Sequence, residues 1–244
     1  MAVLFRSLSA MAALLALSAC LVTPGKFEST LDIRADRQFS FTYKGEILAS
    51  DMKGMESSPA DPAENTEPRT KDSAYTKAAL KDGPDERFDT SNAGGNETQM
   101  RGIAAALSKE KGFRSVRYMG RNRFEIDYAI SGRLTHSFLF PFNSDAKIIL
   151  PFVAVELRGD DRVRVKAPGY SSNFDQSAPP MAQGGSGNDA AKALDGVFTL
   201  TTDAEIISQN QEDGAQAAAQ GKQIMWKITP LTTEAPTATL RVSR

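Results

Sequence analysis

The sequence predicts an α+β domain in which a mainly antiparallel β-sheet packs against one or two helices, with long polar loops between the elements. Apolar and polar residues alternate over many short segments, which is the spacing of a half-buried strand. Most of these segments are joined by short turns, so neighbouring strands are expected to run antiparallel. One later segment, residues 97–111, instead carries the apolar spacing of a helix.

The first segment is predicted to be a signal peptide rather than part of the fold. A single positive charge precedes an apolar run at residues 8–19, which is too short to span a bilayer and fits the centre of a secretion signal. The run ends in Leu17-Ser18-Ala19-Cys20, which resembles a bacterial lipobox. The resemblance implies that signal peptidase II recognises Leu17, Ser18 and Ala19. It then cuts before Cys20, whose sulfur carries a lipid.

The lipobox divides the chain into three parts. Residues 1–19 are assigned to the signal peptide, residues 20–25 to a lipidated tether and residues 26–243 to a single domain. The alternative is an ordinary secretion signal with an incidental cysteine, but a secreted protein seldom keeps one unpaired thiol. Leu21 stands where lipoproteins of the inner membrane commonly carry aspartate, which favours the periplasmic face of an outer membrane.

The domain is predicted to open with a β-hairpin that has an aromatic face. Phe27, Leu31 and Ile33 alternate with polar residues, and the aromatic residues of 39–43 do the same after a turn at 35–37. Both strands are therefore expected to bury one face.

Two segments between the strands differ in character. Residues 56–70 hold three prolines among acidic and small polar residues and are predicted to be a solvated loop or a disordered insertion. A weak helical pattern follows at 72–82. The stronger helix is predicted over 97–111, with Asn96 as its cap and Gly112 at its end. Its apolar face is formed by Met100, Ile103, Ala104 and Leu107.

A second block of strands is predicted after the helix. Residues 116–130 hold two strands joined by a turn at 120–122, and residues 147–157 form a strand that is apolar on both faces. A turn at 159–161 then leads into another strand. Residues 171–190, rich in Gly, Ser and Pro, are predicted to be a long loop. The last strands are expected near 196–208, 222–229 and 237–242.

The composition argues against several classes of site. The chain has 244 residues and a formal net charge of −1, which argues against a nucleic-acid-binding protein. Cys20 and His136 are its only cysteine and histidine, so they form neither a disulfide nor a Cys/His zinc site. His136 is predicted to be a loop or strand-edge residue, and the carboxylate pairs at 160–161 and 203–205 to be turn and strand-surface positions. We expect no catalytic residue, no metal and no cofactor, and hence no enzyme.

The strongest local charge feature is basic. Six lysines and arginines fall between residues 109 and 123 with a single acid, Glu110. In a protein tethered to a membrane, such a patch can contact anionic lipid head groups. The alternative is the solvated end of a helix and the outer face of a hairpin. The expected contacts are Lys111, Arg114, Arg117, Arg121 and Arg123.

An aromatic stripe follows at Phe138, Phe140 and Phe142, with Pro141 inside it. The stripe can line a lipid-binding cleft, but alternate aromatic residues are also what a buried sheet face requires. We expect the stripe to belong to the core.

Three segments, taken in order, resemble the LppM-type domain of bacterial envelope lipoproteins. They are the hairpin after the lipobox, the pair of strands around Gly120, and an end block in which a strand, Asn210, a loop and a strand with Trp226 follow one another. The resemblance covers most of residues 20–243. It implies an antiparallel α+β domain on a lipid anchor, with a cavity or face for lipid-like molecules and no catalytic residues.

These observations together predict a non-enzymatic lipoprotein of the cell envelope. We expect it to be attached to the membrane through Cys20 and to bind a lipid or another envelope component. The alternative is a structural or accessory subunit of an envelope protein complex. An enclosed apolar cavity favours the first function, and an exposed apolar patch above a few hundred Å² favours the second.

Overall fold

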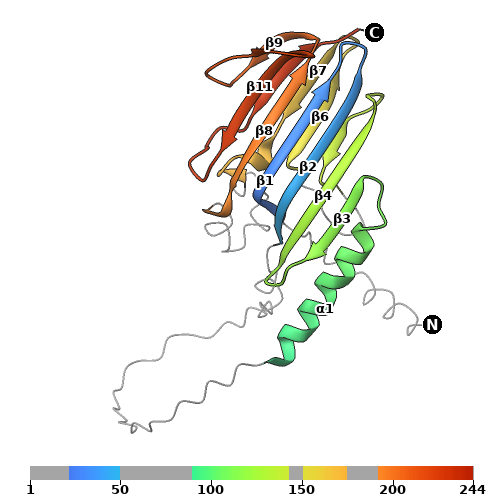
Figure 1. The fold of residues 1–244 in the computed structure, drawn as a ribbon, viewed down its shortest axis with the longest axis vertical. Helices are drawn as coiled ribbons and strands as arrows, with labels where there is room; N and C mark the ends of the chain where they lie inside the picture. The colour runs from blue at the N-terminus through green and yellow to red at the C-terminus, as the bar shows by residue number, and fades with distance from the viewer. Residues whose placement is uncertain (1–21, 50–89, 143–150, 175–191, 244) are drawn as a thin grey trace, which may run out of the picture.

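Two β-sheets pack face to face, with an α-helix against one end of them (Figure 1). The computed structural model describes residues 22–49, 90–142, 151–174 and 192–243. The predicted α+β class with a mainly antiparallel sheet is confirmed. The predicted signal peptide, Cys20, the insertion at 56–70 and the weak helix at 72–82 lie outside the described residues.

The larger sheet has seven strands in the order β10-β11-β8-β1-β2-β4-β3. Its centre is the predicted opening hairpin, in which Leu31 pairs with Phe41 and Ile33 with Phe39. β4 continues the antiparallel order beside β2. The seven strands are β1 (Val22–Ile33), β2 (Gln38–Ala49), β3 (Phe113–Tyr118), β4 (Arg123–Arg133), β8 (Asp195–Thr202), β10 (Gln216–Ala218) and β11 (Gly221–Ile228).

The smaller sheet has five strands in the order β5-β6-β7-β12-β9, and all its pairs are antiparallel. The predicted turn at 159–161 joins β6 to β7, with Gly159 at a φ of 63°. The five strands are β5 (Phe138–Phe140), β6 (Val153–Arg158), β7 (Arg162–Lys166), β9 (Glu205–Gln209) and β12 (Thr237–Arg241).

One pair of strands departs from the antiparallel pattern. β1 and β8 run parallel, with Phe27 opposite Gly196 and Ile33 opposite Thr202. A parallel pair needs a long crossover connection, and here most of the chain lies between the two strands. This pairing joins the two halves of the sequence in the middle of the larger sheet.

The core between the two sheets is aromatic. Phe140 of β5 lies 5.0 Å from Phe41 and 5.1 Å from Tyr43 of β2, measured between ring centroids. Tyr128 of β4 lies 4.6 Å from the same ring. Phe140 is only 1% exposed. Burying a side chain of this size contributes about 1.5–3 kcal/mol to the stability of the fold.

The single strand predicted near 196–208 is wrong, because the segment forms two strands in different sheets. β8 ends at Thr202 and β9 begins at Glu205. Between them, the Thr202 hydroxyl donates to the carbonyl oxygen of Ile33 at 2.6 Å and accepts from the Ala204 N–H at 3.0 Å. These bonds hold the bend at which the chain leaves one sheet for the other. No glycine or proline marks this bend in the sequence.

Helix α1 spans Thr90–Leu107 and therefore begins and ends earlier than predicted. Gly94 and Gly95 are poor helix formers, which hid its first turns from sequence analysis. At its other end, N–H groups of residues 109 and 110 bond to carbonyls three residues back, so the helix tightens into a turn well before Gly112. The predicted apolar face is confirmed, since Met100, Ala104 and Leu107 are buried.

The domain also begins earlier than predicted, because β1 starts at Val22. Val22 pairs with Ala49 and Pro24 pairs with Ile47, so most of the expected tether at 20–25 belongs to the sheet. Val22–Gly25 are all buried. Residues 22–25 lack the alternation of apolar and polar residues that predicts a strand. A register shift between Pro24 and Phe27 separates them from the regular part of β1.

The predicted loop at 171–190 also starts within the packed part of the fold. The short 3₁₀ turn η1 (Pro168–Tyr170) precedes it, and both Ser171 and Phe174 are buried. The Ser171 hydroxyl donates to the carbonyl oxygen of Thr233 at 2.7 Å, which ties this segment to the chain between β11 and β12. Residues 175–190 lie outside the described residues.

Candidate lipid-binding site

Val22 marks one end of the sandwich, which we call the Val22 end. Ala49 lies there as the partner of Val22, and its N–H donates to the carbonyl oxygen of Asn122 at 2.9 Å. Asn122 belongs to the β3–β4 turn, where Arg121 and Asn122 adopt positive φ angles of 52° and 56°. These angles are those of a tight hairpin turn that matches the strand twist. The first described residue and the β3–β4 turn are therefore neighbours.

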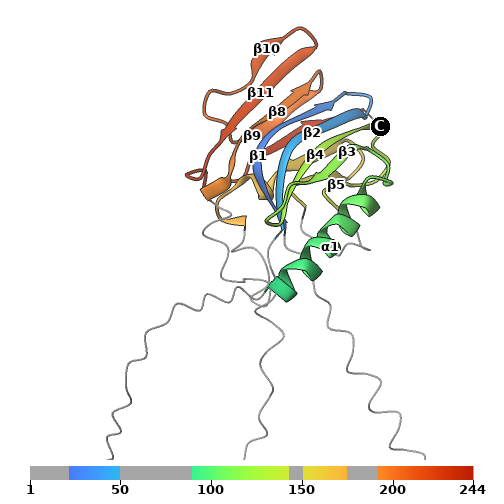
Figure 2. The same cartoon turned by 60° about the horizontal axis from the view of Figure 1, so that its bottom comes forward.

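Helix α1 lies across this end beside β3 and β5, as Figure 2 shows. Between the helix and the larger sheet is an apolar pocket with a volume of about 30 Å³. Its wall combines the start of β1, the end of β2, the hairpin β3–β4 and the buried face of α1. The lining residues are Val22, Ile47, Ala49, Met100, Ile103, Leu107, Phe113, Phe124, Ile126 and Pro141.

The pocket is suited to a small apolar group. All ten lining side chains are apolar, so a buried water would lack the two to four polar partners that hold it. A volume of about 30 Å³ is too small to enclose a whole lipid. The site can instead receive one end of an apolar chain while the rest of the molecule stays outside.

Three arginines of the predicted basic patch pair with carboxylates from neighbouring strands. Arg117 lies 2.6 Å from Glu125, which belongs to β4, and Arg114 lies 3.9 Å from Asp127 of the same strand. The third pair joins Arg123 to Glu46 of β2 at 3.6 Å. Glu46 is far away in sequence, so the single acid counted within the basic segment understates the local negative charge.

The structure also spreads the patch over two ends of β3. Lys109 and Lys111 lie in the turn between α1 and β3, whereas Arg121 lies in the turn after β3. The strand between these turns is about 17 Å long at roughly 3.4 Å per residue. The β3–β4 turn therefore places Arg121 at the Val22 end, beside Asn122, and Arg123 begins β4 opposite Leu48 at the same end.

The aromatic stripe is divided between core and surface. Phe140 is in the core, as expected, and Phe138 is half-buried 5.2 Å from Phe41. Phe142 is 55% exposed. Pro141 between them lines the pocket, which places Phe142 directly beside the pocket at the Val22 end.

His136 and the carboxylate pairs at 160–161 and 203–205 occupy turns and strand surfaces. His136 is exposed between β4 and β5, where its Nδ1 lies 3.0 Å from the hydroxyl of Thr135. Asp161, in the β6–β7 turn, lies 3.9 Å from Arg241, and Glu205 lies 2.7 Å from the same arginine. These contacts agree with the predicted turn and strand-surface positions.

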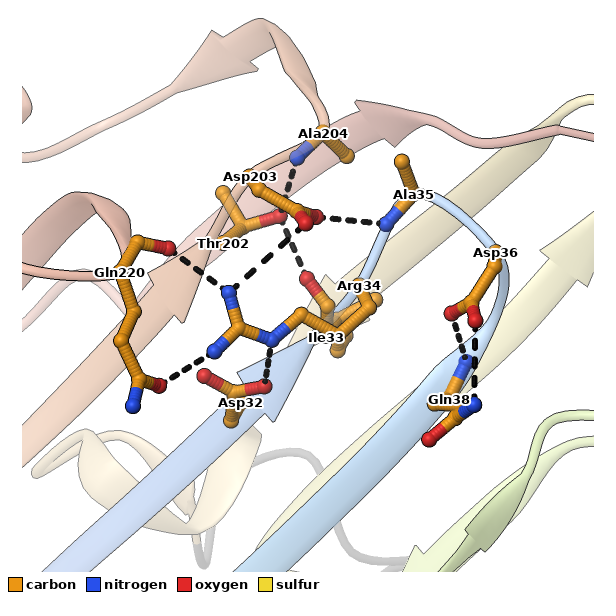
Figure 3. Close-up of polar contacts among 10 residues, drawn as sticks. All are labelled: Asp32, Ile33, Arg34, Ala35, Asp36, Gln38, Thr202, Asp203, Ala204 and Gln220. Atoms are coloured by element: carbon orange, nitrogen blue, oxygen red, sulfur yellow. Dashed lines mark hydrogen bonds and ion pairs between the residues drawn. The ribbon is translucent and has the colours of Figure 1, made fainter.

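A polar cluster joins three turns at the opposite end of the sandwich (Figure 3). Arg34 donates to Asp32 at 2.8 Å and to the carbonyl oxygen of Gln220 at 2.7 Å, and also bonds to the Gln220 side chain. Asp203 accepts from the Ala35 N–H at 2.7 Å. The cluster fastens the β1–β2 turn to the β8–β9 bend and to the β10–β11 turn.

The charges within this cluster are paired with one another and stabilise the contact between the turns. Partial burial raises the pKa of Asp32 above its usual value; Arg34 opposes this rise and Asp203 adds to it. The carboxylates of Asp32 and Asp203 are both engaged with Arg34. These ion pairs explain how the sheet-switching bend is held.

The described residues contain neither a metal-binding cluster nor a helix suited to span a membrane. Within 22–49, 90–142, 151–174 and 192–243, no three His, Cys, Asp or Glu side chains are grouped so as to hold a metal ion. Over the same stretches, no helix combines the length and apolar character that crossing a membrane requires.

Sequence analysis missed the pocket and the Arg34 cluster. It identified the apolar face of α1 but not the surface that this face covers. Val22 and Ala49 are distant from α1 in sequence and lie beside it only in the folded sheet. For the Arg34 cluster, the only sequence signal is a charged residue beside two of its three turns, namely Arg34 and Asp203. Such residues are common at any solvated turn, so the signal is not specific.

The chain shows a likeness to a solved structure. No family model and no curated protein matches the chain. Among solved structures, the NMR structure of the folded domain of the LppM protein of Mycobacterium tuberculosis aligns with 91% of this chain and 92% of that domain. The aligned residues are 15% identical and the TM-score is 0.32, so this domain is a weak structural neighbour of the chain.

Proposed function

We propose that this protein is a non-enzymatic lipoprotein of the cell envelope, anchored by a lipid on Cys20. Signal peptidase II recognises Leu17, Ser18 and Ala19 and releases the chain with Cys20 as its first residue. Leu21 directs it to the periplasmic face of an outer membrane. Residues from Val22 onward form one domain that binds lipid next to the anchor.

The observation that carries this proposal is the location of the apolar pocket. Val22 lines the pocket and is separated from Cys20 by one residue. Two residues of extended chain reach about 7 Å, so the pocket must lie close to the bilayer in which the lipid is buried. An apolar pocket at the attachment point suits contact with an acyl chain better than contact with a soluble ligand.

The basic residues supply a second, weaker element of the proposal. Arg121 lies at the Val22 end and can contact anionic head groups, and Arg123 is beside it with Glu46 as its partner. Arg114 and Arg117 lie further along β3, and Lys111 lies in the turn before it. Arginines near a membrane surface are attracted by its negative potential.

The anchor predicts covalent labelling by palmitate. Cells that express the wild-type chain in the presence of radiolabelled palmitate are expected to yield labelled protein, and Cys20→Ser is expected to abolish the label because no thiol remains to be modified. Leu21→Val is the matched control, since it changes the next residue without removing the thiol, and it should retain the label. Label that persists in Cys20→Ser would exclude this anchor.

The pocket predicts bound lipid in addition to the covalent anchor. Wild-type protein purified from membranes in detergent is expected to release non-covalent lipid that mass spectrometry identifies. Ile103→Phe, which fills the pocket from α1, is expected to reduce that lipid about tenfold by excluding the chain end. Ile207→Phe makes the same change at an exposed position of β9 and should leave the lipid unchanged. Equal amounts of lipid in all three proteins, or none in the wild type, would contradict lipid binding at the pocket.

A further inference from the structure

The large apolar side chains on the surface are concentrated at the Val22 end. Among the described residues, five large hydrophobic side chains are exposed, and three of them are Met119 at 50%, Phe142 at 55% and Leu231 at 88%. The other two, Ile207 and Met225, lie on different strands away from this end. Isolated apolar residues are common on protein surfaces, so the shared location of the three is the feature to explain.

Met119 and Phe142 belong to segments that lie next to the pocket. Met119 begins the β3–β4 turn, and its N–H bonds to the carbonyl oxygen of Arg123 at 2.8 Å. That turn touches Ala49, which lines the pocket. Phe142 follows Pro141, which also lines the pocket. Phe142 is therefore next to a residue that lines the pocket, and Met119 belongs to the turn that bonds to Ala49, the partner of Val22.

Leu231 lies at the same end of the larger sheet, on the side of β1 that carries β8 and β11. β8 runs parallel to β1 and begins with Asp195 opposite Lys26, near the start of β1. β11 runs antiparallel to β8 and ends with Ile228 opposite Gly196. The chain after β11, which contains Leu231, therefore leaves the sheet at the Val22 end.

The position of the chain outside the structure identifies what covers these side chains. Only Leu21 separates Val22 from Cys20, so the lipidated residue lies within about 7 Å of the end of β1. With so short a connection, the Val22 end must face the bilayer. Residues that point outward from this end meet lipid before they meet any soluble molecule.

We propose that Met119, Phe142 and Leu231 insert into the interfacial region of the bilayer, so that the Val22 end is a membrane-contact surface. This inference rests on the proposed anchor at Cys20. Apolar side chains of surface-bound proteins bury at the boundary between head groups and acyl chains, roughly 5–10 Å deep. Arg121, two residues after Met119, lies at the level of the lipid phosphates. The anchor and the three side chains together fix the orientation of the domain on the membrane.

Quenching of tryptophan fluorescence by brominated lipid tests the proposal. The lipidated protein is reconstituted into vesicles of phosphatidylethanolamine and phosphatidylglycerol, with or without bromine on the acyl chains. Phe142→Trp and Leu231→Trp are each compared with wild type, in which the buried Trp226 is the only tryptophan. The bromine-dependent loss of emission is expected to be at least about twofold larger in these variants, because bromine quenches only rings that reach the acyl region.

Met225→Trp is the matched control. Met225 is 53% exposed, nearly as much as Phe142, but it lies in the middle of β11, opposite Thr199 of β8 and away from the Val22 end. Its quenching should equal that of wild type. If the three variants are quenched equally in protein that carries palmitate, the membrane-contact surface is wrong while the anchor stands. If the protein carries no palmitate, the proposed function fails and this inference falls with it.

Discussion

Gly45→Ala is expected to destabilise the domain by about 3 kcal/mol, because there is no space for a methyl group at this position. A Cβ built on Gly45 would lie 2.6 Å from the Cα of Phe27 and closer still to the carbonyl oxygen of Lys26. These atoms belong to the backbone of β1, so they cannot turn aside as a flexible side chain can. Gly45 also has a φ of 155°, in a region that residues with side chains rarely adopt.

Guanidinium unfolding, followed by the emission of Trp226, measures the effect of Gly45→Ala as a lower midpoint at an unchanged slope. Gly102→Ala is the control. Gly102 lies in α1 with no atom within 4 Å of its would-be Cβ, so alanine should stabilise the helix by about 0.5–1 kcal/mol. A Gly45→Ala protein as stable as wild type would show that β1 and β2 are further apart than the structure places them.

Phe140→Ala is expected to cost about 3–5 kcal/mol of stability, which is the cost of removing a buried phenyl ring. Its ring contacts those of Phe41, Tyr43, Tyr128 and Phe152, so the substitution opens a cavity between the two sheets. Three of these neighbours lie in β2 and β4 of the larger sheet and Phe152 directly precedes β6 of the smaller one, so they cannot close the cavity without shifting a strand.

Phe142→Ala is the comparison for Phe140→Ala, since both residues belong to the same aromatic stripe. Phe142 is 55% exposed, and its removal should change the unfolding free energy by less than about 0.5 kcal/mol. Thermal unfolding of the two variants by calorimetry tests the contrast. Equal losses of stability would mean that Phe142 packs in the core, which would also argue against its contact with lipid.

The strands that follow local rules could be predicted from sequence. In the β1–β2 hairpin, Leu31 and Ile33 and the aromatic residues of 39–43 alternate with polar residues, and the turn at 120–122 contains glycine and asparagine, which tolerate a positive φ. The buried face of α1 is equally local, because Met100, Ala104 and Leu107 recur at helical spacing. Each of these features is determined by residues that are close together in the chain.

The features that depend on distant residues could not be predicted. The bend after Thr202 is held by the carbonyl of Ile33, which is 169 residues away, so nothing local marks it. The ion pair between Arg123 and Glu46 joins β4 to β2, and nothing in the sequence indicates that these two strands are adjacent. For the same reason, the pocket could be described only once Val22 and α1 were placed together.

The placement of β1 has a mechanical consequence. This strand is bonded on both sides, to β2 and to β8, and its first residue is the point at which the chain leaves toward Cys20. A force on that point acts along the strand, perpendicular to its hydrogen bonds, so the bonds of both ladders share the load and do not open one by one. The domain is therefore built to resist tension along the line of β1, the direction in which the anchor proposed at Cys20 would pull.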